Sequence, residues 1–222
     1  MKKIDMQYSD NKEFIQSIYD REGLSSKFDK DNIYLEKAFN DIKEIWLNNL
    51  AQIKTVNYLM IAEAPLWGQI KKYIYNPDVN NSQFFYCSDL GEILNKHIKD
   101  KRDFINVCNE IGLLIVDISP FPLNTIDTAI NYRDLKTNQY RKLVSLTIPT
   151  FFEKKLKAIG HKKSESIETF FRYARVKNNF EDLVSKVLIE NKYIKKQSDI
   201  GEISQNGGCV NKAKLKQIIK AV

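Results

Sequence analysis

The chain has 222 residues, and its 43% hydrophobic content is enough to fill the core of one large domain. Its 35 Lys and Arg residues outnumber 28 Asp and Glu residues, and the formal net charge of +7 favours polyanionic partners such as nucleic acid. A genome that uses lysine as its default solubilising residue would produce the same excess, so charge alone does not identify a partner.

The cysteines and the hydropathy of the chain narrow the class of protein. Cys87, Cys108 and Cys209 are an odd number with no close pair, which excludes a disulfide framework and a Cys-x-x-Cys metal site and indicates a reducing compartment. No stretch approaches the roughly 18 apolar residues of a membrane span, and the polar start of the chain has no apolar signal segment. We therefore expect a cytoplasmic protein without a membrane, metal or cofactor requirement.

Helical periodicity dominates the N-terminal part of the chain. Between Asp31 and Ile53 apolar residues recur at steps of three and four, which predicts an amphipathic helix. A shorter pattern over residues 14–19 predicts a helix before it. We expect residues 1–55 to form a helical part that packs on a single domain spanning residues 1–222.

Two short, continuous apolar runs follow, at residues 56–62 and 112–118. Runs of this length are typical of strands buried on both faces of a parallel sheet. Helical patterns at residues 89–98 and 102–111 lie between them. The order strand, helix, strand predicts a βαβ unit with parallel strands.

The rest of the chain continues to alternate helices with short strands. A helix over residues 140–159 is expected to break or bend before Pro149, because proline has no backbone N–H to donate. Residues 167–176 fit either a strand or a short helix. The further expected elements are a helix over 180–189, an edge strand over 199–203 and a helix over 212–221. The predicted fold class is α/β, a three-layer α/β/α arrangement with a mostly parallel four-stranded sheet.

The loops after the two apolar strands are the expected walls of a site. Ligands of open parallel sheets bind beyond the carboxyl ends of the strands. That rule selects the loops at residues 63–68 and 117–124, which begin with Glu63 and Asp117. The turn Gly207-Gly208, just before the last helix, is also a possible phosphate-binding turn.

These residues resemble a known family. The segment from Leu59 to Leu66 contains Glu63-Ala64-Pro65 and resembles the first motif of the uracil-DNA glycosylase superfamily. In thermophilic branches of that family the motif has the sequence Gly-Glu-Ala-Pro-Gly. Residues 85–94 resemble the segment that carries a base-stacking aromatic before a helix, and the strand ending at Asp117 resembles the strand that ends in the base-reading Asn. Residues 204–208 occupy the place of the second catalytic motif, usually His-Pro-Ser. The resemblance covers residues 56–124 and the last two dozen, and leaves the middle of the chain unexplained.

The resemblance implies roles in breaking a glycosidic bond. Glu63 would orient the attacking water or stabilise the cationic sugar, and Asn206 would stabilise the departing base through its amide N–H. The alternative for Glu63 is a helix cap or an ion pair with a lysine.

Base recognition is expected from Tyr86, Asp117, Ala64 and Pro65. Tyr86 would stack on the flipped base, although an ordinary core aromatic explains it almost equally well. Asp117 stands where uracil readers have Asn, and a carboxylate suits the exocyclic amine of a cytosine-type base better than uracil. The alternative is that Asp117 caps the next turn through Ser119.

Contacts to the DNA backbone are expected from Ser119, Gly207, Gly208 and Lys212. A plain helix N-terminus with a solvated lysine face is the alternative for the last three. Members of the family with Glu-Ala-Pro often hold an iron–sulfur cluster on four cysteines, which three scattered cysteines cannot supply, so no cluster is expected.

The functional hypothesis is a DNA glycosylase that removes a uracil-like or modified pyrimidine, with a cytosine-type base as one candidate, from single- or double-stranded DNA and acts as a monomer. Two alternatives remain open. One is an inactive module of the same fold that binds nucleic acid or a nucleotide, and the other is an unrelated α/β enzyme acting on a small phosphorylated metabolite.

Overall fold

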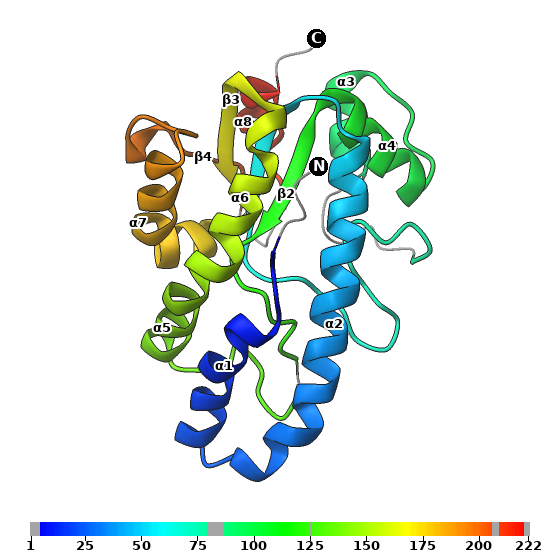
Figure 1. Ribbon diagram of the computed structural model, residues 1–222. Helices are drawn as coiled ribbons and strands as arrows, with labels where there is room; N and C mark the ends of the chain where they lie inside the picture. The colour runs from blue at the N-terminus through cyan, green and yellow to red at the C-terminus, as the bar shows by residue number, and fades with distance from the viewer. Residues whose placement is uncertain (1–4, 80–86, 125, 206–208, 220–222) are drawn as a thin grey trace.

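The computed structural model describes residues 5–79, 87–124, 126–205 and 209–219. It is an α/β structure with a sheet of four parallel strands in the order β2-β1-β3-β4, covered by helices in a three-layer arrangement (Figure 1). This confirms the predicted fold class. The strands are β1 (Val56–Ala62), β2 (Leu113–Asp117), β3 (Lys163–Phe171) and β4 (Gly201–Glu202).

Two helices precede the sheet, as their periodicity predicts. Helix α1 spans Ser9–Arg21, and the long helix α2 spans Ser25–Gln52. Helix α2 begins earlier than Asp31 because the polar segment at its start contributes a buried Phe28. Side chains of both helices belong to the same hydrophobic core as β1, β2 and β3.

Strand β1 is central and pairs in parallel with β2 and β3, which confirms the predicted parallel pair. Strand β2 is at one edge of the sheet, and its outer side is not left open. The Trp46 indole N–H donates to the Ile115 carbonyl at 3.0 Å, and the Ile115 N–H donates to the Tyr75 hydroxyl at 2.6 Å. These bonds satisfy edge groups that would otherwise invite pairing with another chain.

The segment between β1 and β2 holds α3 (Cys87–Leu94) and α4 (Lys101–Ile111). The Asp100 side chain caps α4 by accepting from the Asp103 N–H at 3.0 Å. Gly112 ends α4 with φ of 76°, in the left-handed region, and a Cβ there would lie 2.2 Å from the Thr55 carbonyl oxygen. Glycine is therefore required for the helix to turn directly into β2.

The expected break before Pro149 is confirmed. Helix α5 (Thr137–Thr147) ends there, a π-helical turn, η1, covers Ile148–Phe152, and α6 (Glu153–Ile159) continues the path. The wider turn accommodates a residue that cannot donate a backbone hydrogen bond.

The ambiguous segment at residues 167–176 contains both kinds of structure. Strand β3 ends at Phe171, and α7 (Ala174–Glu190) begins just after it. Strand β4 is the short edge strand expected from the sequence, and α8 spans Lys212–Ile218. The 3-10 turns η2 and η3 cover Gly160–Lys162 and Gln197–Asp199.

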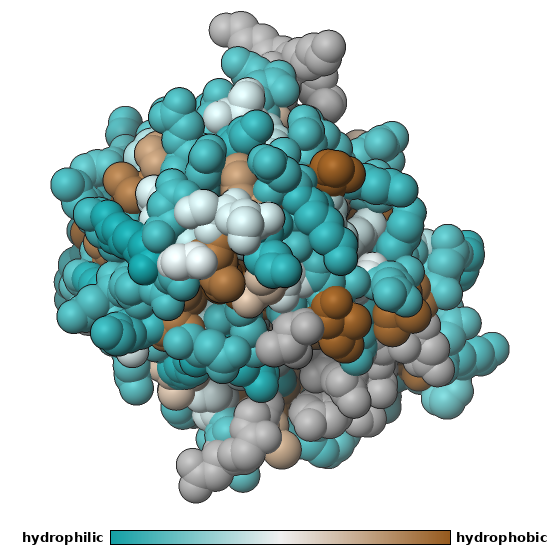
Figure 2. Space-filling view, turned by 90° about the horizontal axis from the view of Figure 1, so that it is seen from below, coloured by the Kyte–Doolittle hydropathy of each residue, from teal (hydrophilic) through white to brown (hydrophobic). Residues whose placement is uncertain are grey.

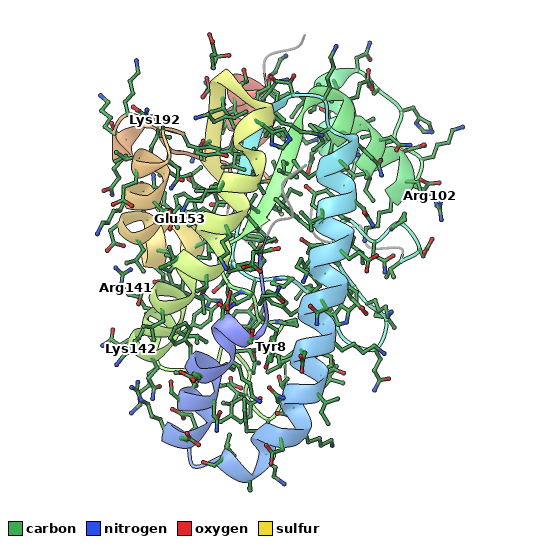
Figure 3. All side chains as sticks on the ribbon, in the orientation of Figure 1. Tyr8, Arg102, Arg141, Lys142, Glu153 and Lys192 are labelled. Carbon is green, nitrogen blue, oxygen red and sulfur yellow. The ribbon has the colours of Figure 1, made fainter. Side chains whose placement is uncertain are left out.

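In Figure 1, α2 and α6 lie in front of the sheet, α8 lies behind it beside α3, and the arrowhead of β2 points towards α1 and α5. Seen from the side to which the strands point, the surface is mostly hydrophilic with scattered apolar residues (Figure 2). Arg141 on α5 reaches α7, where it donates to the Asn179 carbonyl and pairs with Asp182 (Figure 3). No helix among the described residues is both long enough and apolar enough to cross a membrane.

Candidate active site at the strand ends

The loops that leave β1, β2 and β3 are joined by backbone hydrogen bonds. The Ser119 N–H donates to the Glu63 carbonyl at 2.9 Å, and the Ile118 N–H donates to the Ala62 carbonyl at 3.0 Å. On the other side of β1, the Arg172 N–H donates to the Ile61 carbonyl at 2.9 Å. The residues that follow three neighbouring strands are therefore held together at the carboxyl ends of these strands.

Glu63 is the first residue beyond the central strand, and its side chain is only 12% exposed. Burial raises the pKa of its carboxyl group, while the positive charges of Arg175 and then Arg133 lower it. The Arg175 Nη2 atom lies 3.0 Å from Glu63 Oε1, but the alignment is not that of a hydrogen bond. We call Glu63, Arg133 and Arg175 the acid–arginine site.

A cavity of about 280 Å³ adjoins the acid–arginine site. Both arginines line it, together with the aromatic rings of Tyr132, Tyr140 and Phe180. The guanidinium groups of Arg133 and Arg175 lie 5.7 and 5.4 Å from the centre of the Tyr132 ring. Two cations held over one ring can bind a phosphate or carboxylate group, and the aromatic rings provide surfaces on which a planar ligand stacks.

Tyr140 connects this cavity with the loop after β2. Its side chain is buried, and its ring packs edge-on against Phe180 with the centroids 5.6 Å apart. Burial raises the pKa of the Tyr140 hydroxyl far above its ordinary value; the Glu63 charge raises it further, while Ser119 lowers it. The hydroxyl therefore stays protonated and can donate a hydrogen bond.

Asp117 lies in a different environment from Glu63. Asp117 pairs with Ala62 in the register of β1 and β2, so these two side chains share one face of the sheet. Because side chains alternate along a strand, the side chain of the next residue, Glu63, leaves from the opposite face. Asp117 is 3% exposed; its Oδ2 accepts from the Tyr73 hydroxyl at 3.2 Å and lies 3.8 Å from the Lys155 ammonium nitrogen. Its base-reading role stays a prediction, and its observed contacts are with these two core residues.

Lys155 and Asp117 form a pair in the core, and the pKa values of both groups are shifted. Burial raises the pKa of Asp117, and the Lys155 charge and the Tyr73 hydrogen bond oppose that rise. Burial lowers the pKa of Lys155 to about 8, and the Asp117 charge opposes that fall. The Lys155 ammonium also lies 4.2 Å from the centre of the Phe151 ring. Aromatic faces and one carboxylate therefore replace water around this cation.

The other residues selected from the sequence have mixed surroundings. Ala64 is half-buried, while Pro65 and Ser119 are buried. Lys212 pairs with Glu92 at 2.5 Å and Asp89 at 3.4 Å, and these contacts tie α8 to α3. Four predicted site residues lie outside the described part of the chain: Tyr86, Asn206, Gly207 and Gly208.

Sequence reasoning missed both arginines and the tyrosines beside them. Arg175 lies in the first turn of α7, four residues after β3 ends, so the strand-end rule would have pointed to its surroundings if residues 163–171 had been recognised as a strand. Arg133 lies in the segment before α5, where the sequence offers only the adjacent pair Tyr132-Arg133 as a signal. Among the described residues, no three His, Cys, Asp or Glu side chains gather as metal ligands would.

The fold and this geometry define an α/β protein with a largely buried acid, two arginines and an aromatic cavity beyond the carboxyl ends of its strands. Comparison with protein families, with curated proteins and with solved structures finds no match to the chain.

Proposed function

We propose that this chain is a DNA N-glycosylase, which hydrolyses the bond between a uracil-like or modified pyrimidine base and its deoxyribose. The observation that carries the proposal is Glu63, a largely buried acid at the carboxyl end of the central strand, which contacts an arginine that lines a cavity with aromatic walls. The motif Glu63-Ala64-Pro65, which resembles that of the uracil-DNA glycosylase superfamily, supports the same activity.

Glu63 has the properties that activation of a water molecule requires. Burial raises its pKa, which makes the carboxylate a stronger base, and the two arginines keep its ionised form accessible. In the proposed step, the water oxygen bonds to the sugar C1′ carbon and its proton passes to Glu63. The electron pair of the C1′–N bond leaves with the base, which then takes up a proton.

The cavity beside Glu63 fits one part of a flipped nucleotide. Its volume of about 280 Å³ is close to the lower end of the range for small-ligand pockets, so it can hold a single phosphate or ring and no long stretch of DNA. Arg133 and Arg175 would bind a phosphate that flanks the target, and Tyr132 would stack on the sugar or base. The net charge of +7 would add long-range attraction to DNA.

The direct test is base release from oligonucleotides, single- and double-stranded, that contain uracil, hypoxanthine, 5-hydroxymethylcytosine or glucosylated cytosine. Abasic sites are detected by cleavage in alkali. We expect release of at least one base, and loss of about 10²- to 10⁴-fold in rate in Glu63→Gln. The matched control is Glu190→Gln, the same change at an exposed residue at the end of α7, which should keep full activity.

Binding without cleavage is the second candidate function. The observation that favours it is the 3.0 Å contact between Arg175 and Glu63, because the cation reduces the basicity of the carboxylate. In that case no base is released, yet the protein binds DNA in a salt-sensitive way and Glu63→Gln changes neither property. Absence of both base release and DNA binding would reject the proposal and point to a small phosphorylated metabolite.

A further inference from the structure

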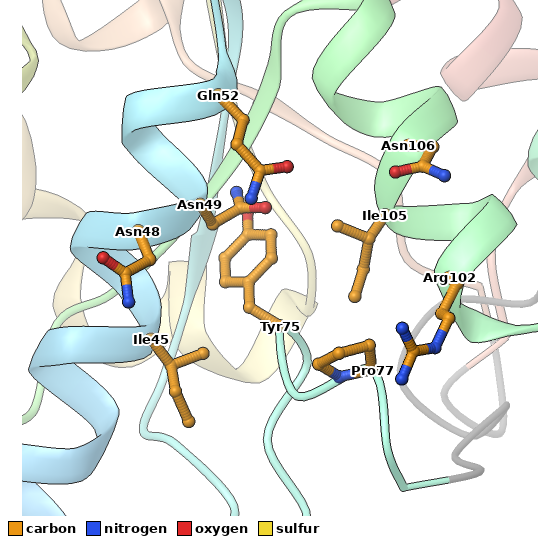
Figure 4. A pocket seen from close by; sticks show the side chains of 9 residues that line it. All are labelled: Ile45, Asn48, Asn49, Gln52, Tyr75, Pro77, Arg102, Ile105 and Asn106. Atoms are coloured by element: carbon orange, nitrogen blue, oxygen red, sulfur yellow. The ribbon is translucent and has the colours of Figure 1, made fainter.

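A second pocket lies between α2 and α4, away from the strand ends, and shares no described lining residue with the cavity beside Glu63 (Figure 4). Its volume is about 350 Å³, within the range of small-ligand pockets. Four side-chain amides line this α2–α4 pocket, from Asn48, Asn49, Gln52 and Asn106. Ile45, Ile105 and the ring of Tyr75 form its apolar walls.

Asn49 is the buried polar group of this pocket, with an exposed fraction of 4%. Its Oδ1 accepts from Asn109 Nδ2 at 3.1 Å, while its own Nδ2 has no hydrogen-bond partner among the described residues. Asn109 Oδ1 is also buried without a partner in the described part of the chain. Turning both amides over would exchange the roles and still leave one donor and one acceptor unused.

Unused amide groups of this kind are costly unless a molecule from outside the chain binds them. A buried donor without a partner has lost its hydration without compensation, and native proteins contain few of them. Here the unpartnered amide belongs to Asn49, a residue of a pocket lining that contains three further amides. Each amide offers both a donor and an acceptor, so the lining suits a ligand that presents both kinds of group side by side.

The charge at the mouth of the pocket argues for an uncharged ligand. Arg102 is the one charged residue among the described residues of the lining, and its Nη2 lies 2.5 Å from the Asp78 carboxylate. Both side chains are well exposed, so this pair stays in water; Figure 3 labels Arg102 at the rim of the molecule. With the arginine already paired, the described part of the mouth has no free cation to attract a phosphate.

We infer that the α2–α4 pocket binds a small, uncharged, planar heterocycle with adjacent hydrogen-bond donors and acceptors, of the chemical class of a free nucleobase. The apolar residues Ile45 and Ile105 contact the faces of the ring, and the amides of Asn48, Asn49 and Asn106 contact its polar edge. The inference does not depend on the proposed glycosylase activity, because Glu63 and its arginines take no part in it.

The test uses the full chain labelled with ¹⁵N, in which side-chain amides give their own NMR signals. Uracil, cytosine, adenine and nicotinamide are titrated separately, with orthophosphate as the anionic probe and toluene as a ring without hydrogen-bonding groups. We expect at least one heterocycle to shift the Asn49 amide signals in a saturable manner, while orthophosphate and toluene do not. The inference is overturned if no heterocycle shifts them, or if orthophosphate or toluene binds as well.

Substitutions at exposed positions separate binding from folding. Asn106→Ala and Asn48→Ala each remove one amide from the pocket wall and should weaken binding about tenfold. Asn40→Ala is the matched control, because Asn40 is an exposed asparagine on the same helix outside the pocket. It should leave the affinity within about twofold, and equal weakening by Asn40→Ala and Asn48→Ala would overturn the assignment. Glu63→Gln should leave binding unchanged, which distinguishes this site from the proposed active site.

Discussion

The Lys155 ammonium nitrogen lies 3.8 Å from the Asp117 carboxylate, and the two side chains are 0% and 5% exposed. The pair joins α6 to the end of β2 beneath the aromatic rings of Trp46 and Phe151. Removing one charge of a buried pair leaves the other without compensation, which is far more costly than removing both.

Lys155→Met should therefore destabilise the fold by about 3–5 kcal/mol, because it leaves the Asp117 carboxylate buried without its cation. The double variant Lys155→Met with Asp117→Asn should recover part of the loss, since the amide carbonyl introduced by the second change can still accept from the Tyr73 hydroxyl. Urea denaturation measures both variants. A double variant that is less stable than Lys155→Met would contradict the idea that the uncompensated charge causes the loss.

Stability should also depend on pH through Lys155. Burial lowers its pKa from 10.5 to about 8, so between these values the unfolded chain binds more protons than the folded one. The free energy of unfolding should therefore rise as pH increases above about 8. Above about pH 10 the buried hydroxyl of Tyr73, with its raised pKa, acts in the opposite direction. The measurement is denaturation at a series of pH values, and Lys155→Met should lose the rise between about pH 8 and pH 10.5.

The titration of Glu63 should respond to its arginine. Arg175→Gln removes the cation 3.0 Å from the carboxylate, and the pKa of Glu63 should rise further because burial then acts with less opposition. Carboxyl ¹³C NMR of Glu63 measures the change. Arg141→Gln is the control, since Arg141 pairs with Asp182 on α7. A Glu63 pKa that stays the same in Arg175→Gln would show that the ion pair does not form in solution.

Buried parallel strands were predictable because they consist of continuous apolar runs, and β1 and β2 are both of this kind. Strand β3 was predicted only as one of two alternatives for residues 167–176, because its first half carries Lys163, Ser164 and Glu165 and only its end is buried. Arg175, in the first turn of the helix after β3, was missed for the same reason. The sequence also placed Glu63 and Asp117 at the ends of adjacent strands, but it could not show that their side chains have separate partners, Arg175 and Lys155.

Two glycines with positive φ supply a matched pair of substitutions, Gly112 before β2 and Gly23 between α1 and α2. Gly112 and Gly23 have similar positive φ values of 76° and 69°, so alanine strains both by about 1–2 kcal/mol. An added Cβ at Gly23 meets open space, whereas at Gly112 it lies 2.2 Å from the Thr55 carbonyl oxygen. Gly112→Ala should therefore cost clearly more in urea denaturation than Gly23→Ala. Equal losses would show that the segment around Thr55 moves aside without cost.

Salt dependence tests whether the acid–arginine site meets a phosphate. If Arg133 and Arg175 each contact one phosphate of DNA, Arg133→Gln and Arg175→Gln should each reduce the slope of log K against log salt by about 1, with little dependence on sequence. Lys212→Gln should change the slope less, because Lys212 already pairs with Glu92 and Asp89. Fluorescence anisotropy with a labelled oligonucleotide at several salt concentrations gives these slopes. If Lys212→Gln reduces the slope of log K against log salt more than either arginine substitution does, the DNA lies over α8 and the arginines bind another anion.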